Sequence, residues 1–232
     1  MNIALILSGG IGTRLGADIP KQYIEAGGRP ILFYCIETLS VSPQIDAIQI
    51  VSHPQWQDFI QEGMERYDIR DKFRKFSLPG ENRQLSILHG LEDISEYAGD
   101  GDQILIHDAA RPLLSQEQIE TCMNAMLGHD GVIPVLPMKD TVYCSKDGRQ
   151  ISSLLNRNEV YAGQAPEVFL LGKYLEANKR LLPEKILQIN GSTEPAIIAG
   201  LDIVMVPGDE RNFKITTKGD LEDFEKIIRQ RL

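Results

Sequence analysis

The sequence has few cysteines, few histidines and no long apolar run. Its three cysteines, Cys35, Cys122 and Cys144, are too scattered for a disulfide framework and form no CxxC pair that binds zinc. The four histidines are too far apart for an obvious metal cluster. No apolar run reaches the roughly 18 residues of a transmembrane helix, and the start, MNIALILSGG, lacks the basic segment of a signal peptide. We therefore expect a cytoplasmic protein whose cysteines are small buried apolar residues.

The chain also lacks an excess of basic residues. It has 24 Lys and Arg against 33 Asp and Glu, and its formal net charge is −9. Broad binding to nucleic acid or to a membrane surface requires a basic face, so we expect neither partner. One small anionic ligand remains compatible with this charge. A chain of 232 residues also needs no disulfide or metal to stabilise its core, because it buries on the order of 70% of its unfolded surface.

Apolar runs of strand length alternate with amphipathic stretches of helix length. We expect strands over 2–8, 47–52, 75–78, 103–107, 131–136 and 202–206. We expect helices over 30–40, 55–67, 83–96, 116–127, 168–182 and 194–199, and a last one from a Thr217 cap to about Arg229. This alternation predicts an α/β fold with a mostly parallel sheet and helices on both faces. We find no linker or repeat and expect a single domain over residues 1–232.

The pattern changes after residue 138. Two strand-like runs, 141–145 and 150–155, flank a Lys-Asp-Gly-Arg segment. Asp-Gly between such runs is a strong hairpin signal. We expect a protruding β-arm that covers a site or a partner subunit. A surface hairpin with no role is the alternative.

A glycine-rich loop follows the first strand. It contains Gly9, Gly10, Gly12 and Gly16, with Arg14 among them and Lys21 shortly after. Glycines let backbone N–H groups approach phosphate oxygens closely, and the two cations add charge. The loop is neither a Walker A motif nor the dinucleotide fingerprint, because it lacks Gly-Lys-Ser/Thr and its third glycine is displaced. It favours a polyphosphate ligand over a turn that only joins strand to helix.

Other charged residues follow later strands. Asp108, three residues before Arg111, could hold Mg²⁺ or a ribose hydroxyl while the arginine holds a phosphate. An ion pair between the two that only shapes the turn is the alternative. Arg157 beyond the arm could bind a phosphate with two hydrogen bonds, and Lys214 follows the last strand. Either could instead be an ordinary solvated side chain.

These residues suit one kind of chemistry. The chain offers several loop cations and one carboxylate, without a Ser-His-Asp or Cys-His arrangement. Phosphoryl and nucleotidyl transfer depend mainly on positioning and on charge neutralisation. The sequence therefore predicts an enzyme of this class.

Three motifs together resemble a known family. GGIGTR at 9–14 with PKQ at 20–22, HDAARP at 107–112 and NFKIT at 212–216 resemble the cytidylyltransferases of the 2-C-methyl-D-erythritol 4-phosphate and ribitol-5-phosphate type. The resemblance covers essentially the whole chain. It implies a Rossmann-like nucleotidyltransferase fold and a homodimer that exchanges the arm, residues 139–155. It also implies that CTP and a polyol phosphate react, with Mg²⁺, to give a CDP-polyol and pyrophosphate.

The resemblance also implies roles for single residues on the nucleotide side. Those around cytosine and the phosphates are Ser8, Gly9, Gly10 and Gly12, and those of the base-reading segment PGENRQLS are Gly80 and Ser86. The catalytic cations around the CTP phosphates are Arg14, Lys21 and Lys214. Asp108 matches the acidic residue near the metal and the ribose. The side chains expected to bind the polyol phosphate are Arg111, Thr141 and Arg157, with Arg157 and the arm supplied by the neighbouring subunit.

Two departures from the family pattern lie on the acceptor side. Ala165 stands where the family has the threonine of Gln-Thr-Pro, and 192–195 replaces a Thr-Asp-Asp/Glu segment. HDAARP resembles the methylerythritol enzymes, whereas GGIGTR and residues 156–164 resemble the ribitol-phosphate enzymes. The acceptor therefore stays open between these two and a further polyol or sugar phosphate. Alternative interpretations are a CTP-binding regulatory homologue without acceptor turnover and an enzyme that uses UTP or GTP.

Overall fold

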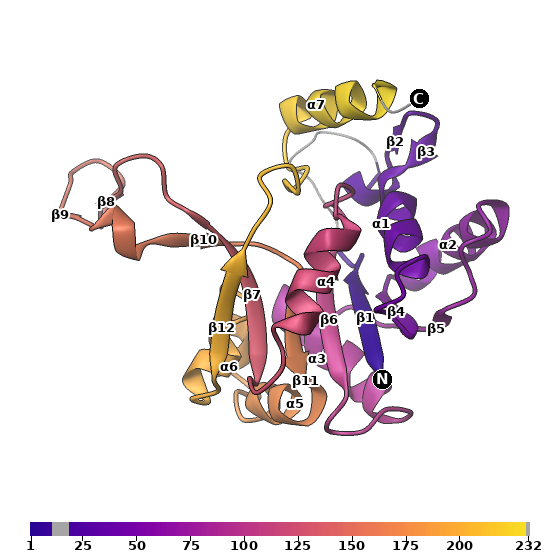
Figure 1. Ribbon diagram of the computed structural model, residues 1–232, viewed down its shortest axis with the longest axis horizontal. Coiled ribbons are helices and arrows are strands. Elements are labelled where there is room, and N and C mark those ends of the chain that lie inside the picture. The colour runs from indigo at the N-terminus through magenta and orange to yellow at the C-terminus, as the bar shows by residue number, and fades with distance from the viewer. Residues whose placement is uncertain (11–18, 231–232) are drawn as a thin grey trace.

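The computed structural model describes residues 1–10 and 19–230, and a central sheet organises them (Figure 1). The strands of this sheet in the described residues are β1 (Asn2–Leu7), β4 (Ala47–Val51), β5 (Phe73–Ser77), β6 (Gln103–Asp108), β7 (Gly131–Pro137), β10 (Tyr161–Gly163), β11 (Glu167–Leu170) and β12 (Ile203–Pro207). Their order is β10-β7-β11-β6-β1-β4-β5, with β12 also paired to β7. The β5-β4-β1-β6 body and the β7-β12 pair are parallel. Strand β11 runs antiparallel between β6 and β7, and β10 is antiparallel to β7.

Helices cover both faces of the sheet, as the sequence predicts (Figure 1). One face packs against α1 (Ile31–Ser40), α2 (Pro54–Arg66) and α4 (Gln116–Asn124). The other packs against α3 (Arg83–Ser95), α5 (Leu171–Lys179) and α6 (Glu194–Ile198). Alternate residues of a strand point to opposite faces, and both sets are apolar in β1: Ala4 and Ile6 join the first layer, Ile3 and Leu5 the second.

One expected helix is wrong at its start. Residues 168–182 were expected to be helical, but Glu167–Leu170 forms β11 and α5 begins only at Leu171. Val168 packs into one hydrophobic layer and Phe169 into the other, and both are fully buried. A strand between β6 and β7 buries both of these side chains, which is why the tertiary structure overrides the helical pattern.

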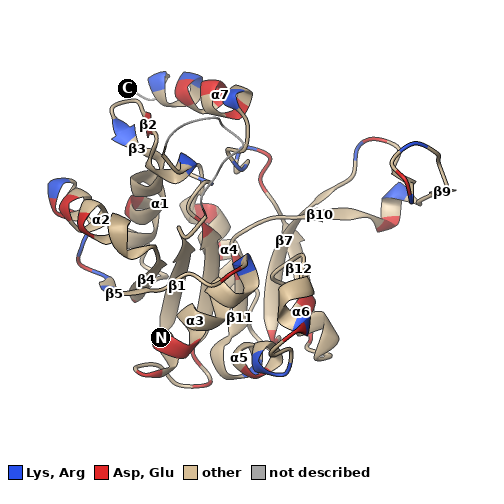
Figure 2. Ribbon diagram, turned by 180° about the vertical axis from the view of Figure 1, so that it is seen from behind, with Lys and Arg blue, Asp and Glu red and all other residues tan. Residues whose placement is uncertain are grey.

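A hydroxyl side chain caps each of two helices. The Thr217 hydroxyl accepts from the Asp220 N–H and forms the expected capping box at α7 (Lys218–Arg229). The Ser115 hydroxyl accepts from the Gln118 N–H and caps α4, and the Gln118 side chain donates to the Pro207 carbonyl. Helix α7 packs its apolar side near the short hairpin of β2 (Glu25–Ala26) and β3 (Arg29–Pro30). Figure 2 shows basic and acidic residues mixed along α7, as on a solvent-facing helix.

The predicted arm leaves the body between β7 and β10. Its strands, β8 (Tyr143–Cys144) and β9 (Ser153–Leu154), pair antiparallel and project away from the sheet (Figure 1). The Asp147 carboxylate accepts the N–H groups of Arg149 and Gln150, each at 2.9 Å, and closes the turn. Within the described part of the chain, no helix has the length and hydrophobicity to cross a membrane.

Candidate active site

A cleft of about 550 Å³ lies beyond the carboxyl ends of β1 and β6. Its lining comes from separated segments of the chain: Gly9 and Gly10, Lys21 and Gln22, the Gly80–Ser86 region, Asp108 to Ala110, and Lys214 with Thr216. In open α/β sheets, ligands bind outside the carboxyl ends of the strands. The described part of the glycine loop and the predicted loop residues after β6 thus share one cavity.

The start of the glycine loop has a fixed backbone. The Gln22 amide donates to the Ser8 carbonyl at 2.7 Å and to the Gly10 carbonyl at 2.9 Å. A Cβ atom at Gly9 would lie 2.6 Å from Cβ of Pro79, so a larger residue does not fit there. Gly10 has open space around its Cα. Such a loop lets a ligand approach the backbone closely.

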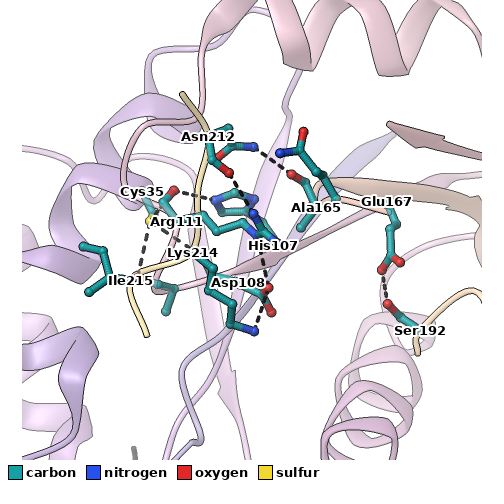
Figure 3. A network of polar contacts seen from close by, with 12 residues as sticks. Cys35, His107, Asp108, Arg111, Ala165, Glu167, Ser192, Asn212, Lys214 and Ile215 are labelled. Carbon is teal, nitrogen blue, oxygen red and sulfur yellow. Dashed lines mark hydrogen bonds and ion pairs between the residues drawn. The ribbon is translucent and has the colours of Figure 1, made fainter. Parts of the chain in front are cut away.

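Asp108 at the end of β6 gathers three cations, and Figure 3 shows two of them, Arg111 and Lys214, beside its carboxylate. Its Oδ1 accepts from Nε and Nη2 of Arg83, at 3.3 and 3.2 Å. Its Oδ2 lies 3.0 Å from Nζ of Lys214 and 3.3 Å from Nε of Arg111. Burial alone raises the pKa of Asp108, but these cations outweigh it and hold the pKa well below its usual range. Asp108 is therefore an ionised anchor that orients the basic side chains.

Two buried groups support the loop that follows β6. His107 Nε2 lies 3.0 Å from the Arg111 carbonyl, and the Cys35 thiol lies 3.4 Å from the same oxygen. Burial lowers the pKa of His107 to about 4 and raises the pKa of Cys35 to about 12. His107 is thus a neutral hydrogen-bond donor and Cys35 a protonated thiol near neutral pH. Both hold the loop, and His107 is a packed, hydrogen-bonding residue.

The two predicted catalytic lysines reach the cleft from opposite ends of the chain. Lys21 begins the short 3₁₀ turn η2 (Lys21–Tyr23), and its Nζ donates to the Ile215 carbonyl at 2.7 Å. Lys214 precedes that residue and contacts Asp108. The Ile215 N–H donates to the Ala110 carbonyl at 2.9 Å, which attaches this late segment to the loop after β6.

Most predicted nucleotide-side residues meet at the cleft. Those that line it are Gly9, Gly10, Lys21, Gly80, Ser86, Asp108 and Lys214. Ser8 is buried beside them, with its carbonyl bound by Gln22. Gly12 and Arg14 lie outside the described residues. Their roles, like those of the other site residues, remain predictions.

The predicted acceptor-side residues are separated. Arg111 is bound to Asp108, and its Nη1 donates to the Asn212 carbonyl at 2.7 Å. Thr141 lies exposed in the arm and Arg157 lies exposed just beyond it, where Arg157 Nη1 donates to the Lys139 carbonyl at 3.0 Å. A single chain therefore does not bring Thr141 and Arg157 to its own cleft.

Sequence reasoning missed three side chains that build the site. Arg83, at the start of α3, reads as a solvated residue of a helix first turn, yet it contacts Asp108. Gln22 belongs to the PKQ motif and had no predicted role of its own, although its side chain fixes the glycine loop. Glu167 stands one residue before the helix expected over 168–182, where no strand was expected. The proximity of Arg83 to the predicted Gly80 and Ser86 was the one available signal.

The carboxylates of the described residues do not form a metal site made of protein ligands alone. They are compatible with an ion that is bound mainly by the phosphates of a nucleotide. No cluster of three or more His, Cys, Asp or Glu that could hold a metal occurs among the described residues. Both Asp108 oxygens already contact cations. Mg²⁺ is commonly held by one or two carboxylates together with substrate phosphates. Asp108, which lines the cleft, could hold a Mg²⁺ ion bound chiefly by a triphosphate if that ion replaced one of its present cation contacts.

Comparison with known proteins agrees with this geometry. The family model described as 2-C-methyl-D-erythritol 4-phosphate cytidylyltransferase (IspD) matches residues 2–230. A protein of that name from Geobacter metallireducens is 34% identical, over 99% of this chain and 98% of its own length. The ribitol-5-phosphate cytidylyltransferase of Lactiplantibacillus plantarum is 30% identical over 100% of both chains.

A solved structure shares the fold at similar coverage. The 4-diphosphocytidyl-2C-methyl-D-erythritol synthase of Anaerococcus prevotii superposes with a TM-score of 0.83 and 27% identity, over 99% of this chain and 96% of that one. The sequence motifs, the cleft and the architecture thus agree on one family. The chain belongs to the 2-C-methyl-D-erythritol 4-phosphate cytidylyltransferase family.

Proposed function

We propose that this protein transfers CMP from CTP to a polyol phosphate and releases pyrophosphate. The observation that supports this most directly is the convergence of Lys21, Lys214 and Asp108 on one cleft beside the glycine loop. The Gly80–Ser86 side of that cleft would hold the cytosine. Relatives named for two different polyol phosphates support the substrate class. The three cysteines are free, which fits work in the cytoplasm.

The reaction is an in-line substitution at phosphorus. A phosphate oxygen of the acceptor forms a bond to the α-phosphorus of CTP, and the bond to the bridging oxygen breaks, so that pyrophosphate leaves. Lys21 and Lys214 stabilise charge on the α-phosphate oxygens, and Arg14 stabilises the departing pyrophosphate. The attacking phosphate is ionised near neutral pH, so the chain needs no general base.

Magnesium belongs to this proposal as an ion that arrives with CTP. When bound, it neutralises phosphate charge and orients the triphosphate. Asp108 is its proposed protein ligand. Lys214 and Arg111 contact one oxygen of this carboxylate, so the residue that would hold the ion also orients two cations of the site.

An acceptor panel tests the function. We expect CTP and Mg²⁺ with 2-C-methyl-D-erythritol 4-phosphate, ribitol 5-phosphate or another polyol phosphate to release pyrophosphate, measured by a coupled assay. UTP and GTP serve as nucleotide controls. CTP binding without turnover of any acceptor would contradict the proposal and favour a regulatory homologue. Equal or better turnover with UTP or GTP would overturn the choice of nucleotide.

We further propose that two chains form a homodimer through the arm. The arm exposes large apolar side chains: Tyr143 is 54% exposed, Ile151 67% and Leu154 63%. Such side chains on a projecting hairpin are suited to burial against a partner. Thr141 and Arg157 then reach the neighbour's cleft and bind the acceptor phosphate there.

Arm variants test the dimer. We expect Ile151→Asp with Leu154→Asp to halve the molar mass measured by light scattering, because buried carboxylates would disrupt an apolar interface. Leu127→Asp is the matched control, since Leu127 is 90% exposed on the body, three residues after the end of α4. A monomeric wild-type protein, or a double variant that stays dimeric, would contradict this assignment.

A further inference from the structure

A second buried carboxylate lies behind the cleft. Glu167 is the first residue of β11 and pairs in register with Ile106 of β6. Asp108 is two residues beyond Ile106 on β6, so the side chains of Glu167 and Asp108 lie on the same face of the sheet as diagonal neighbours. Both residues are buried, at 7% exposure each. Two like charges thus occupy adjacent positions on one face.

Arg83 lies between these carboxylates. Its Nη2 is 3.2 Å from Oδ1 of Asp108 and 4.0 Å from Oε2 of Glu167. The hydroxyls of Ser192 and Thr193 donate to Glu167 from the loop before α6, the second at 3.0 Å. Figure 3 shows the Glu167 carboxylate directed toward Ser192. Glu167 is therefore held from one side and contacts Arg83 on the other.

Without Glu167, the cluster would hold three cations against the single carboxylate of Asp108. Asp108 already has Lys214 and Arg111 as partners in addition to Arg83. Among the described residues, Arg83 is the cation within ion-pair distance of Glu167. Burial raises the pKa of Glu167 above its ordinary value, and Arg83 and the two hydroxyls, which favour the ionised form, offset only part of that rise. A glutamine here would keep an acceptor for the hydroxyls and avoid a buried charge.

Arg83 is placed to meet a ligand. It lines the cleft beside Asn82 and Ser86, and its side chain is 36% exposed. Within residues 1–10 and 19–230, no hydrogen bond engages its Nη1. Both bonds to Asp108 go to a single oxygen, about which the planar guanidinium could pivot. A second carboxylate fixes the plane of the group.

We propose that Glu167 is a positioning residue for nucleotide binding, whose charge holds Arg83 so that its Nη1 faces the phosphates of CTP. This inference rests on the proposed function. Its effect falls on CTP and not on the acceptor, because Arg83 belongs to the same segment as Gly80 and Ser86. An interaction with the bound nucleotide that is equal in the ground and transition states changes KM and leaves kcat nearly constant.

Glu167→Gln tests the proposal. We expect the Kd for CTP with Mg²⁺, measured by calorimetry without acceptor, to rise about tenfold, as for loss of one well-placed charge contact. The KM for CTP should rise equally, with kcat within about threefold. In an Arg83→Gln background the same substitution should change Kd less than about twofold, since it acts through Arg83. Glu176→Gln, which removes an exposed Glu–Arg pair of α5, is the control.

Thr193→Val distinguishes two roles of Glu167: positioning Arg83, and supporting the loop before α6. It removes one hydroxyl partner and keeps the Glu167 charge, so CTP affinity should stay within about twofold of wild type. Equal losses in Thr193→Val and Glu167→Gln, or equal effects of Glu167→Gln with and without Arg83, would overturn the proposal in favour of a structural role. Unchanged CTP affinity in Glu167→Gln would overturn it outright. Because Kd needs no acceptor, a wild-type protein that binds CTP but turns over no acceptor would refute only the proposed function.

Discussion

Lys214→Ala is expected to lower kcat by a factor on the order of 10²–10³, the usual cost of losing one charge donor to a transition state. Lys214 lines the cleft and is oriented by Asp108 at 3.0 Å. Lys21 lies in the same cleft and is tied to the Ile215 carbonyl. Both lysines are thus fixed before substrate arrives, and Lys21→Ala should lower kcat by the same order.

Steady-state kinetics at saturating CTP and acceptor measures this effect. Lys218→Ala is the matched control, because Lys218 is an exposed lysine four residues along the same segment. Circular dichroism melting checks that each variant folds. Near-normal turnover in both Lys21→Ala and Lys214→Ala would remove the two lysines from the mechanism. A rise in KM with unchanged kcat would make them binding residues instead.

Much of the fold could be predicted because its strands are short apolar runs separated by amphipathic helices. Strands such as β1 and β6 are covered on both faces of the sheet, so successive residues along them are apolar. A short run of this kind indicates a buried strand. At β11, the continuous apolar run led to the wrong prediction of a helix. Its apolar residues continue without a break into those of α5, so no local signal marks where the strand ends, and only pairing with β6 and β7 decides it.

Some residues of the site could be predicted from the sequence, and others could not. Loop residues after strands could be identified because the carboxyl ends of parallel strands meet at one edge of the sheet. Arg83 could not, because its partner Asp108 is 25 residues away and its own position begins a helix. Glu167 depended on the register of β11 against β6. Contacts between distant segments are set by packing and have no signature in the local sequence.

Arg157→Ala should lower kcat/KM for the acceptor by about 10²-fold and leave the Kd for CTP unchanged, because a lost charge-assisted contact to phosphate costs a few kcal/mol. Arg157 is exposed near an arm that projects away from its own sheet (Figure 1). The cleft of the same chain is lined without it among the described residues. The effect should therefore arise in the neighbour's site. An equal loss of CTP affinity would contradict this division of the site.

Mixed dimers decide between the neighbour's site and the same chain's site. If the arm is exchanged, each site combines Lys214 of one chain with Arg157 of the other. A dimer of one Lys214→Ala chain and one Arg157→Ala chain then holds one site that carries both substitutions and one site that carries neither. Random pairing makes half of the dimers mixed, so refolding the two variants together should restore about one quarter of wild-type activity in a symmetric dimer. If Arg157 serves its own chain, every site keeps one defect. The mixture would then stay at the mean of the two variants, and the exchanged arm would lose its catalytic role.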